Sequence, residues 1–144
     1  FFMAKTYFTL EEANNLLKQI EPKARKLQKL FFDAYELNDV QVSFNPDNTE
    51  SQLFVLDLNK KRHKLLFEFF ELMEELVKLG IVVKDLKKGL FDFYSKYDKS
   101  DILLCWQIGE KEIEFFHDER QGFRGRLPVS ILKKEYEEKL RELI

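Results

Sequence analysis

Residues 9–37, TLEEANNLLKQIEPKARKLQKLFFDAYEL, carry the clearest structural signal in the chain. Apolar residues recur at alternating steps of three and four, which is typical of a helix that packs along one seam. Thr9 and Glu12 form a capping box, because each side chain can bond the other's backbone N–H. Pro22 lies inside the pattern, so we expect a kink or a break there. The two seam rows of the predicted helix, residues 10–37, are Leu10, Leu17, Ala24, Phe31 and Ala13, Ile20, Leu27, Ala34.

A second helical pattern follows a polar loop at residues 38–52. Apolar residues repeat every seven positions, and others widen the stripe beyond what one partner helix covers. Gly80 is a suitable end, because glycine readily adopts the left-handed conformation that follows many helices. We therefore predict a helix over about 55–79 that pairs with the first helix as a coiled-coil-like antiparallel hairpin. The widened part of the stripe includes Leu66, Phe70 and Met73.

The periodicity after the second helix changes from helical to alternating. Residues 81–86 and 90–94 read as two strands, and Gly89 occupies the turn between them. Residues 101–108 and 113–119 read as a second hairpin. Four short consecutive strands predict a small antiparallel β-meander.

The C-terminal residues return to a helical pattern, which predicts a short helix over 130–143. A chain of 144 residues fits one domain and can bury a core without disulfides or metal. The expected fold of residues 1–144 is therefore α+β, with a long helical hairpin, a small antiparallel meander and a C-terminal helix.

Composition excludes several classes of protein. The formal net charge of −2 gives no global attraction to nucleic acid or to an anionic membrane. The longest apolar runs are only a few residues, too short to span a membrane. A single cysteine cannot form an internal disulfide, which favours a cytoplasmic location. The content of Lys and Glu is compatible with a thermophilic source.

Three segments of the chain resemble one protein family. They are TYFTLEEAN (6–14), VVKDLKKGLFDF (82–93) and LLCWQIGEKEIEFFHDERQGFRGR (103–126). They are similar to the uncharacterised prokaryotic family known as domain of unknown function 2203. The resemblance implies no activity, substrate or catalytic residue. It implies only the positions of a family pattern, namely Asp85, Gly89, Asp92, Cys105, Trp106, Gly109, Glu110, His117, Gly122, Gly125 and Arg126.

Cys105 and His117 are the first candidates for a chemical site, because zinc is bound mostly by such residues. The chain has one cysteine and two histidines, which is too few for a site of four Cys and His ligands. With a loop of two or four residues, Cys105 would pair with Phe116 and His117 with Leu104, on opposite faces of the sheet. A three-residue loop with a bulge would place Cys105 and His117 on one face. We expect no metal and no cofactor.

An enzyme is the weakest functional hypothesis. It would use Cys105, Asp85 and His117 within hydrogen-bond reach of one another. Apolar neighbours surround Cys105 in the sequence, and a cysteine buried among them is an inert small hydrophobe. The chain is therefore expected not to be an enzyme.

The arginines suggest a second hypothesis, a binding module for an anionic ligand such as a nucleotide or RNA phosphate. The planar guanidinium suits phosphate and carboxylate, and the nearby glycines let backbone N–H groups approach an anion. The same arginines could instead pair with carboxylates inside the protein. The candidate anion-binding residues are His117, Arg120, Arg124 and Arg126.

The leading hypothesis is a non-enzymatic interaction or scaffold protein that acts through its helical hairpin. An apolar stripe wider than one partner requires can bury against a second copy or another protein. We therefore expect a homodimer through the helices.

Overall fold

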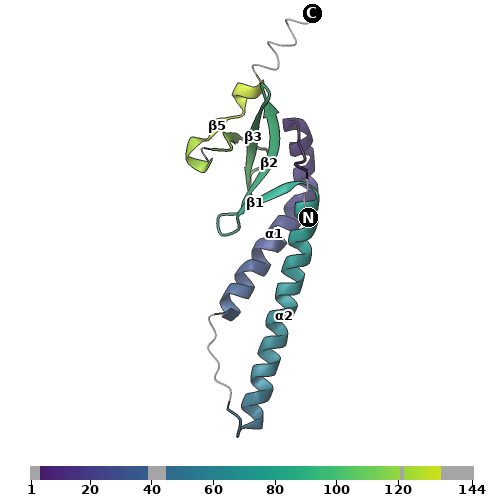
Figure 1. The fold of residues 1–144 in the computed structure, drawn as a ribbon, viewed down its shortest axis with the longest axis vertical. Helices are drawn as coiled ribbons and strands as arrows, with labels where there is room; N and C mark the ends of the chain where they lie inside the picture. Colours follow the sequence, from purple (N-terminus) through teal and green to yellow (C-terminus); the bar gives the residue numbers. More distant parts are fainter. Residues whose placement is uncertain (1–3, 39–44, 121, 134–144) are drawn as a thin grey trace, which may run out of the picture.

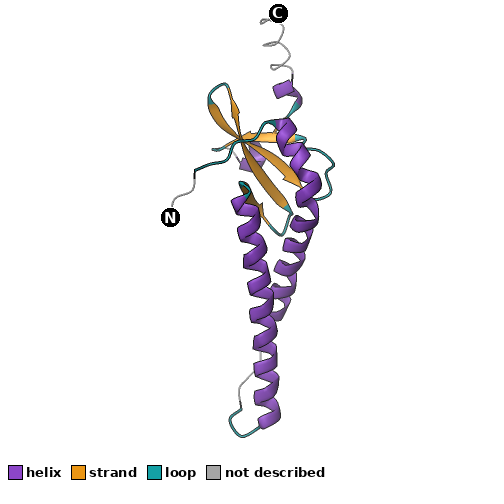
Figure 2. Cartoon of the chain, turned by 90° about the vertical axis from the view of Figure 1, so that its right-hand side faces the viewer, coloured by secondary structure: helices purple, strands orange, loops and turns teal. Residues whose placement is uncertain are grey.

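The computed structural model describes residues 4–38, 45–120 and 122–133 (Figure 1). Two long helices are followed by a five-stranded antiparallel sheet, in which strands consecutive in the chain are neighbours. The sheet lies at one end of the helical hairpin (Figures 1 and 2). The predicted α+β fold is confirmed. The elements are α1 (Leu10–Asn38), α2 (Thr49–Lys78), β1 (Ile81–Asp85), β2 (Leu90–Tyr97), β3 (Ser100–Gln107), β4 (Phe115–Asp118), a 3₁₀ turn η1 (Gly122–Gly125) and β5 (Leu127–Pro128).

Helix α1 begins with the predicted capping box and continues without a break. The backbone N–H of Glu12 donates to Oγ1 of Thr9 at 3.1 Å. Of the kink or break expected at Pro22, the break is ruled out, because helix α1 runs through this residue. Ile20 and Ala24 on either side of the proline are completely buried, so packing against the core stabilises the helix where one backbone hydrogen bond is lost.

Helix α2 begins at Thr49, earlier than the predicted start near residue 55. The side chain of Asn48 caps it by accepting the backbone N–H of Ser51 at 3.1 Å. The predicted loop is correspondingly shorter, and residues 39–44 within it lie outside the described residues. Neither α1 nor α2, as far as the structure describes them, has a stretch long and apolar enough to cross a bilayer.

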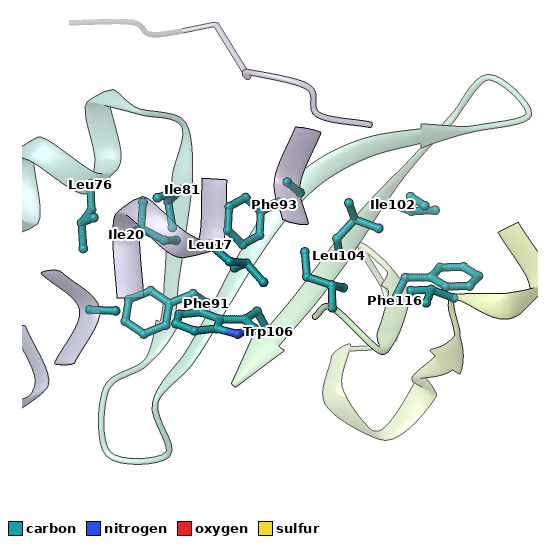
Figure 3. Close-up of a cluster of buried hydrophobic side chains, with 14 of the residues drawn as sticks. Leu17, Ile20, Leu76, Ile81, Phe91, Phe93, Ile102, Leu104, Trp106 and Phe116 are labelled. Atoms are coloured by element: carbon teal, nitrogen blue, oxygen red, sulfur yellow. The ribbon is translucent and has the colours of Figure 1, made fainter. Parts of the chain in front are cut away.

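The hydrophobic core lies between the helices and one face of the sheet (Figure 3). The predicted seam of α1 is confirmed, since Leu17, Ile20 and Leu27 are buried. Helix α2 contributes less, with only Leu58 and Leu76 buried among its described residues. The aromatic and aliphatic residues that the sheet supplies to the core are Ile81, Phe91, Phe93, Ile102, Leu104, Trp106 and Phe116.

The predicted meander is present, with longer strands than expected. Strands β2 and β3 pair over all eight residues of each, through a turn in which Asp98 and Lys99 have positive φ. The sequence did not predict this turn, because residues with positive φ in such turns are usually glycine or asparagine and neither residue is. Strand β5 was not predicted, since it has only two residues and one is proline. Residues 130–133 are helical, and the rest of the predicted C-terminal helix lies outside the described residues.

The register between β3 and β4 differs from that of a tight hairpin. Cys105 pairs with Phe115, and Leu103 pairs with His117. The connection is longer because Ile113 is buried in the core and its N–H donates to Oδ1 of Asn14 on α1, at 2.8 Å. The pairing expected for a two- or four-residue loop is therefore wrong, and Cys105 and His117 lie on the same face.

Gly80 gives a first testable prediction. Its φ is +95°, and a Cβ added there would lie 2.5 Å from Cβ of Thr6. We expect Gly80→Ala to lower the free energy of unfolding by about 1–3 kcal/mol, measured by urea denaturation. Gly109→Ala is the matched control, because Gly109 has a similar φ of +105° with no atom within 4 Å. Equal losses for the two variants would show that the contact with Thr6 adds nothing.

Candidate functional site

A polar cluster lies on the sheet face opposite the helices. It consists of Asp92 on β2, Cys105 on β3 and His117 on β4. Asp92 and Cys105 are direct partners in the sheet, and His117 is diagonal to Cys105 on the next strand. All three side chains are buried, and one ligand atom from each lies within 4.8 Å of the others. The cluster therefore exists only because three strands align in this register.

The hydrogen bond of His117 shows which of its ring nitrogens faces the cluster. Its Nδ1 lies 2.9 Å from the carbonyl oxygen of Asp118. A carbonyl oxygen only accepts, so Nδ1 carries a proton and Nε2 faces the cluster. Nε2 lies 3.3 Å from Oδ2 of Asp92. Among the described residues, neither oxygen of Asp92 accepts a well-aligned hydrogen bond, although this side chain is completely buried.

The cluster does not activate Cys105 as a nucleophile. Burial, and then the negative charge of Asp92, raise the pKa of the Cys105 thiol to about 12. Asp92 also raises the pKa of His117, which favours an imidazolium paired with the carboxylate. Without a bound cation the thiol stays protonated at neutral pH, which is the opposite of what catalysis by a thiolate requires.

Asp85, which the enzyme hypothesis combined with Cys105 and His117, has a different position. It lies at the end of β1, and its Oδ1 accepts the N–H of Lys88 in the turn at 3.0 Å. Asp92 is the acidic residue beside Cys105 and His117 instead. The pattern Phe91-Asp92-Phe93 was the available signal, because an acid between two core aromatics on a strand must face the other side of the sheet.

Arg120 and Arg126 of the predicted anion-binding loop make contacts within the protein. The backbone N–H of Arg120 donates to Oδ1 of Asp118 at 2.8 Å. The guanidinium of Arg126 stacks on the ring of Phe115, 4.6 Å from its centroid. Phe115 is the β4 partner of Cys105, so Arg126 lies on the same sheet face as the cluster. The side chain of Arg124 is outside the described part of the chain.

Other family-pattern residues serve the architecture. The indole N–H of Trp106 donates to the carbonyl oxygen of Glu110 at 2.8 Å, and Oε1 of Glu110 accepts the N–H of Gln107 at 2.6 Å. Burial raises the pKa of the Glu110 carboxyl. Gly89 and Gly109 have positive φ in turns. These positions therefore stabilise the meander.

A second candidate region is the outward face of α2. Phe67 and Phe70 are 65% and 62% exposed in the middle of this helix. Of the residues predicted to widen the apolar stripe of α2, Leu66 and Phe70 are exposed, whereas Met73 packs against the core. Phe67 was missed, because a single aromatic residue opposite the buried stripe has no periodic signal.

The two helices also separate away from the sheet. An open pocket of about 370 Å³ lies between them, lined by Phe31, Leu66 and Phe69 among others. The first turns of α2 extend beyond the end of α1 (Figures 1 and 2). These turns carry exposed Leu53, Phe54 and Leu56. Apolar surface is therefore exposed along much of α2.

Comparison with known proteins identifies a family without assigning an activity. No curated protein and no solved structure matches the chain significantly. The model of the family described as "Uncharacterized conserved protein (DUF2203)" matches residues 6–129, which include both the cluster and the helical hairpin. The chain therefore belongs to the DUF2203 family.

Proposed function

We propose that this protein is a non-enzymatic interaction protein that pairs with a second copy of itself through the outward face of α2. The observation that carries the proposal is the exposure of Phe67 and Phe70. Burying one phenylalanine side chain stabilises an assembly by about 1.5–3 kcal/mol. Adjacent large apolar side chains that remain exposed commonly mark an interaction site.

The order of charges along α2 supports a second copy as the partner. In the turns next to Phe67, residues 60–66 are basic and residues 68–75 are acidic. A two-fold axis near Phe67 places the basic half of each α2 against the acidic half of the other, in an antiparallel pair. Such a pair is self-complementary and brings the two Phe67 side chains together. The basic residues are Lys60, Lys61, Arg62 and Lys64, and the acidic residues are Glu68, Glu71, Glu74 and Glu75.

One predicted contact follows from helical spacing. Lys64 precedes Phe67 by three residues and Glu71 follows it by four, so all three lie on one face of α2. Lys64 and Glu71 are exposed. In the antiparallel pair, Lys64 of each copy faces Glu71 of the other.

The oligomeric state tests the proposal. We expect a dimer by light scattering and sedimentation at micromolar concentration, and a monomer for Phe67→Glu with unchanged helical content. Leu127→Glu is the matched control, because Leu127 is an exposed apolar residue on β5, away from α2. Wild-type protein that stays monomeric at high concentration would overturn the proposal.

A charge exchange separates this arrangement from nonspecific association. Lys64→Glu places two carboxylates opposite each other at each end of the contact, which weakens the dimer. Adding Glu71→Lys restores opposite charges at both symmetric positions and should recover the dimer. If the double variant dissociates as readily as the single variant, this antiparallel register is wrong.

A further inference from the structure

We propose that Asp92, Cys105 and His117 bind a zinc ion on the sheet face opposite the helices. This inference is independent of self-association through α2. The three residues offer a carboxylate oxygen, a thiolate sulfur and an imidazole nitrogen, and zinc accepts all three donor types. A fourth coordination position is left for water or another small ligand.

The spacing of the donor atoms fits tetrahedral zinc. Bonds of zinc to nitrogen and oxygen measure about 2.0–2.2 Å, so two such ligands of a tetrahedron lie about 3.3–3.6 Å apart. Nε2 of His117 and Oδ2 of Asp92 are 3.3 Å apart. They face each other without the alignment of a hydrogen bond. The sulfur of Cys105 lies within 4.8 Å of both.

The surroundings of His117 match those of a metal ligand. Metal-binding histidines usually donate the other ring N–H to a carbonyl or carboxylate, which orients the ring. Nδ1 of His117 has such an acceptor, the carbonyl oxygen of Asp118 at 2.9 Å. Nε2 is therefore the nitrogen directed toward Asp92 and Cys105.

Asp92 is the observation that points most directly to a cation. A buried carboxylate normally accepts several hydrogen bonds, because leaving its oxygens without them costs free energy. Asp92 is completely buried, and neither oxygen has an aligned donor among the described residues. His117 lies 3.3 Å from one oxygen and can balance the charge, but the lone pairs of the carboxylate lack aligned donors, and a bound cation would occupy them.

Charge balance allows the site to remain buried with and without zinc. Without metal, a proton on Nε2 of His117 would balance the carboxylate of Asp92, which lies 3.3 Å away. When zinc binds, bonds to oxygen, nitrogen and sulfur form, and the thiol proton and any proton on Nε2 leave to solvent. The divalent cation with one carboxylate, one thiolate and a neutral imidazole also sums to zero. Up to two protons are released for each zinc.

The wild-type protein provides the decisive test. Protein stripped with a chelator is titrated with zinc in a calorimeter, and the heat in buffers of different ionisation enthalpy counts the protons released. Cobalt is then added in place of zinc. We expect one equivalent of metal, proton release, and the absorption band of a thiolate bound to cobalt. Failure to bind zinc, or a cobalt spectrum without that band, would overturn the proposal, and neither measurement depends on a variant that folds.

Variants assign the ligands. Cys105→Ser and Asp92→Asn change few atoms, and each should weaken zinc binding by more than about tenfold. His63→Gln is the matched control, because His63 is the other histidine and is exposed on α2. Zinc should also raise the melting temperature of the wild type but not of Cys105→Ser. Zinc binding that survives Cys105→Ser and is lost in His63→Gln would place the metal elsewhere.

Discussion

Replacing Trp106 with alanine is expected to lower the free energy of unfolding by about 3–5 kcal/mol. The side chain is completely buried and packs on Phe91, with ring centroids 5.7 Å apart. The substitution leaves a cavity where the helices meet the sheet (Figure 3). It also removes the donor to the carbonyl oxygen of Glu110, which shapes the turn after β3. Trp106 is the only tryptophan, so the variant has no tryptophan fluorescence to follow. Urea denaturation monitored by circular dichroism measures the loss of stability instead.

Trp106→Phe separates packing from hydrogen bonding. Phenylalanine keeps an aromatic ring in the core but has no N–H to donate, so we expect a smaller loss of about 1–3 kcal/mol. A loss below about 1 kcal/mol for Trp106→Ala would contradict the burial of this side chain.

Replacing His117 with leucine is expected to cost about 3–5 kcal/mol in a buffer that contains a metal chelator. Leucine preserves most of the side-chain volume, but Asp92 then remains buried without the imidazole that lies 3.3 Å from it. An uncompensated buried charge is far more costly than the loss of an exposed ion pair. Chemical denaturation of wild type and variant at the same pH measures the difference.

The double variant Asp92→Leu with His117→Leu identifies the cause. Replacing both members of a buried pair by apolar residues is often neutral, so the double variant should recover most of the lost stability. If it is as unstable as His117→Leu alone, the damage comes from packing and not from the buried charge.

The contribution of His117 also depends on pH. Asp92 raises the pKa of His117 above its ordinary value of 6.5, so the folded protein holds this proton more tightly than the unfolded chain. The resulting stability is complete below pH 6.5 and is lost as pH rises through the folded pKa. The difference in free energy of unfolding between wild type and His117→Leu should therefore become smaller as pH rises over that window. All measurements are made in a buffer that contains a chelator. A gap that widens would contradict the direction of this shift.

The helical part of the fold follows from local patterns. Ala13, Leu17 and Leu27 recur with helical spacing in the sequence, and all are buried in the structure. The capping box at Thr9 and Glu12 could also be predicted from the sequence, because its partners are three residues apart. Pro22 does not break helix α1, because its local cost is outweighed by core contacts with residues distant in the chain.

The candidate site was less predictable, although its residues were all recognised as part of a family pattern. Strand alternation places Asp92 on the face away from Phe91 and Phe93, but it does not show that this face is covered. The partnership of Cys105 with His117 depended on a register that no local pattern specifies. Ile113 decided that register by inserting into the core and bonding to Asn14 on α1.

By itself, the sequence determined the α+β class, the order of two long helices and a meander, and the inward face of α1. These features depend on spacings of three, four or two residues, which are visible within any short window. Only the tertiary structure decided that Asp92, Cys105 and His117 share one buried site and that Phe67 remains exposed. Both outcomes depend on contacts between residues far apart in the chain, such as Ile113 with Asn14, and their energies are not encoded in any single segment.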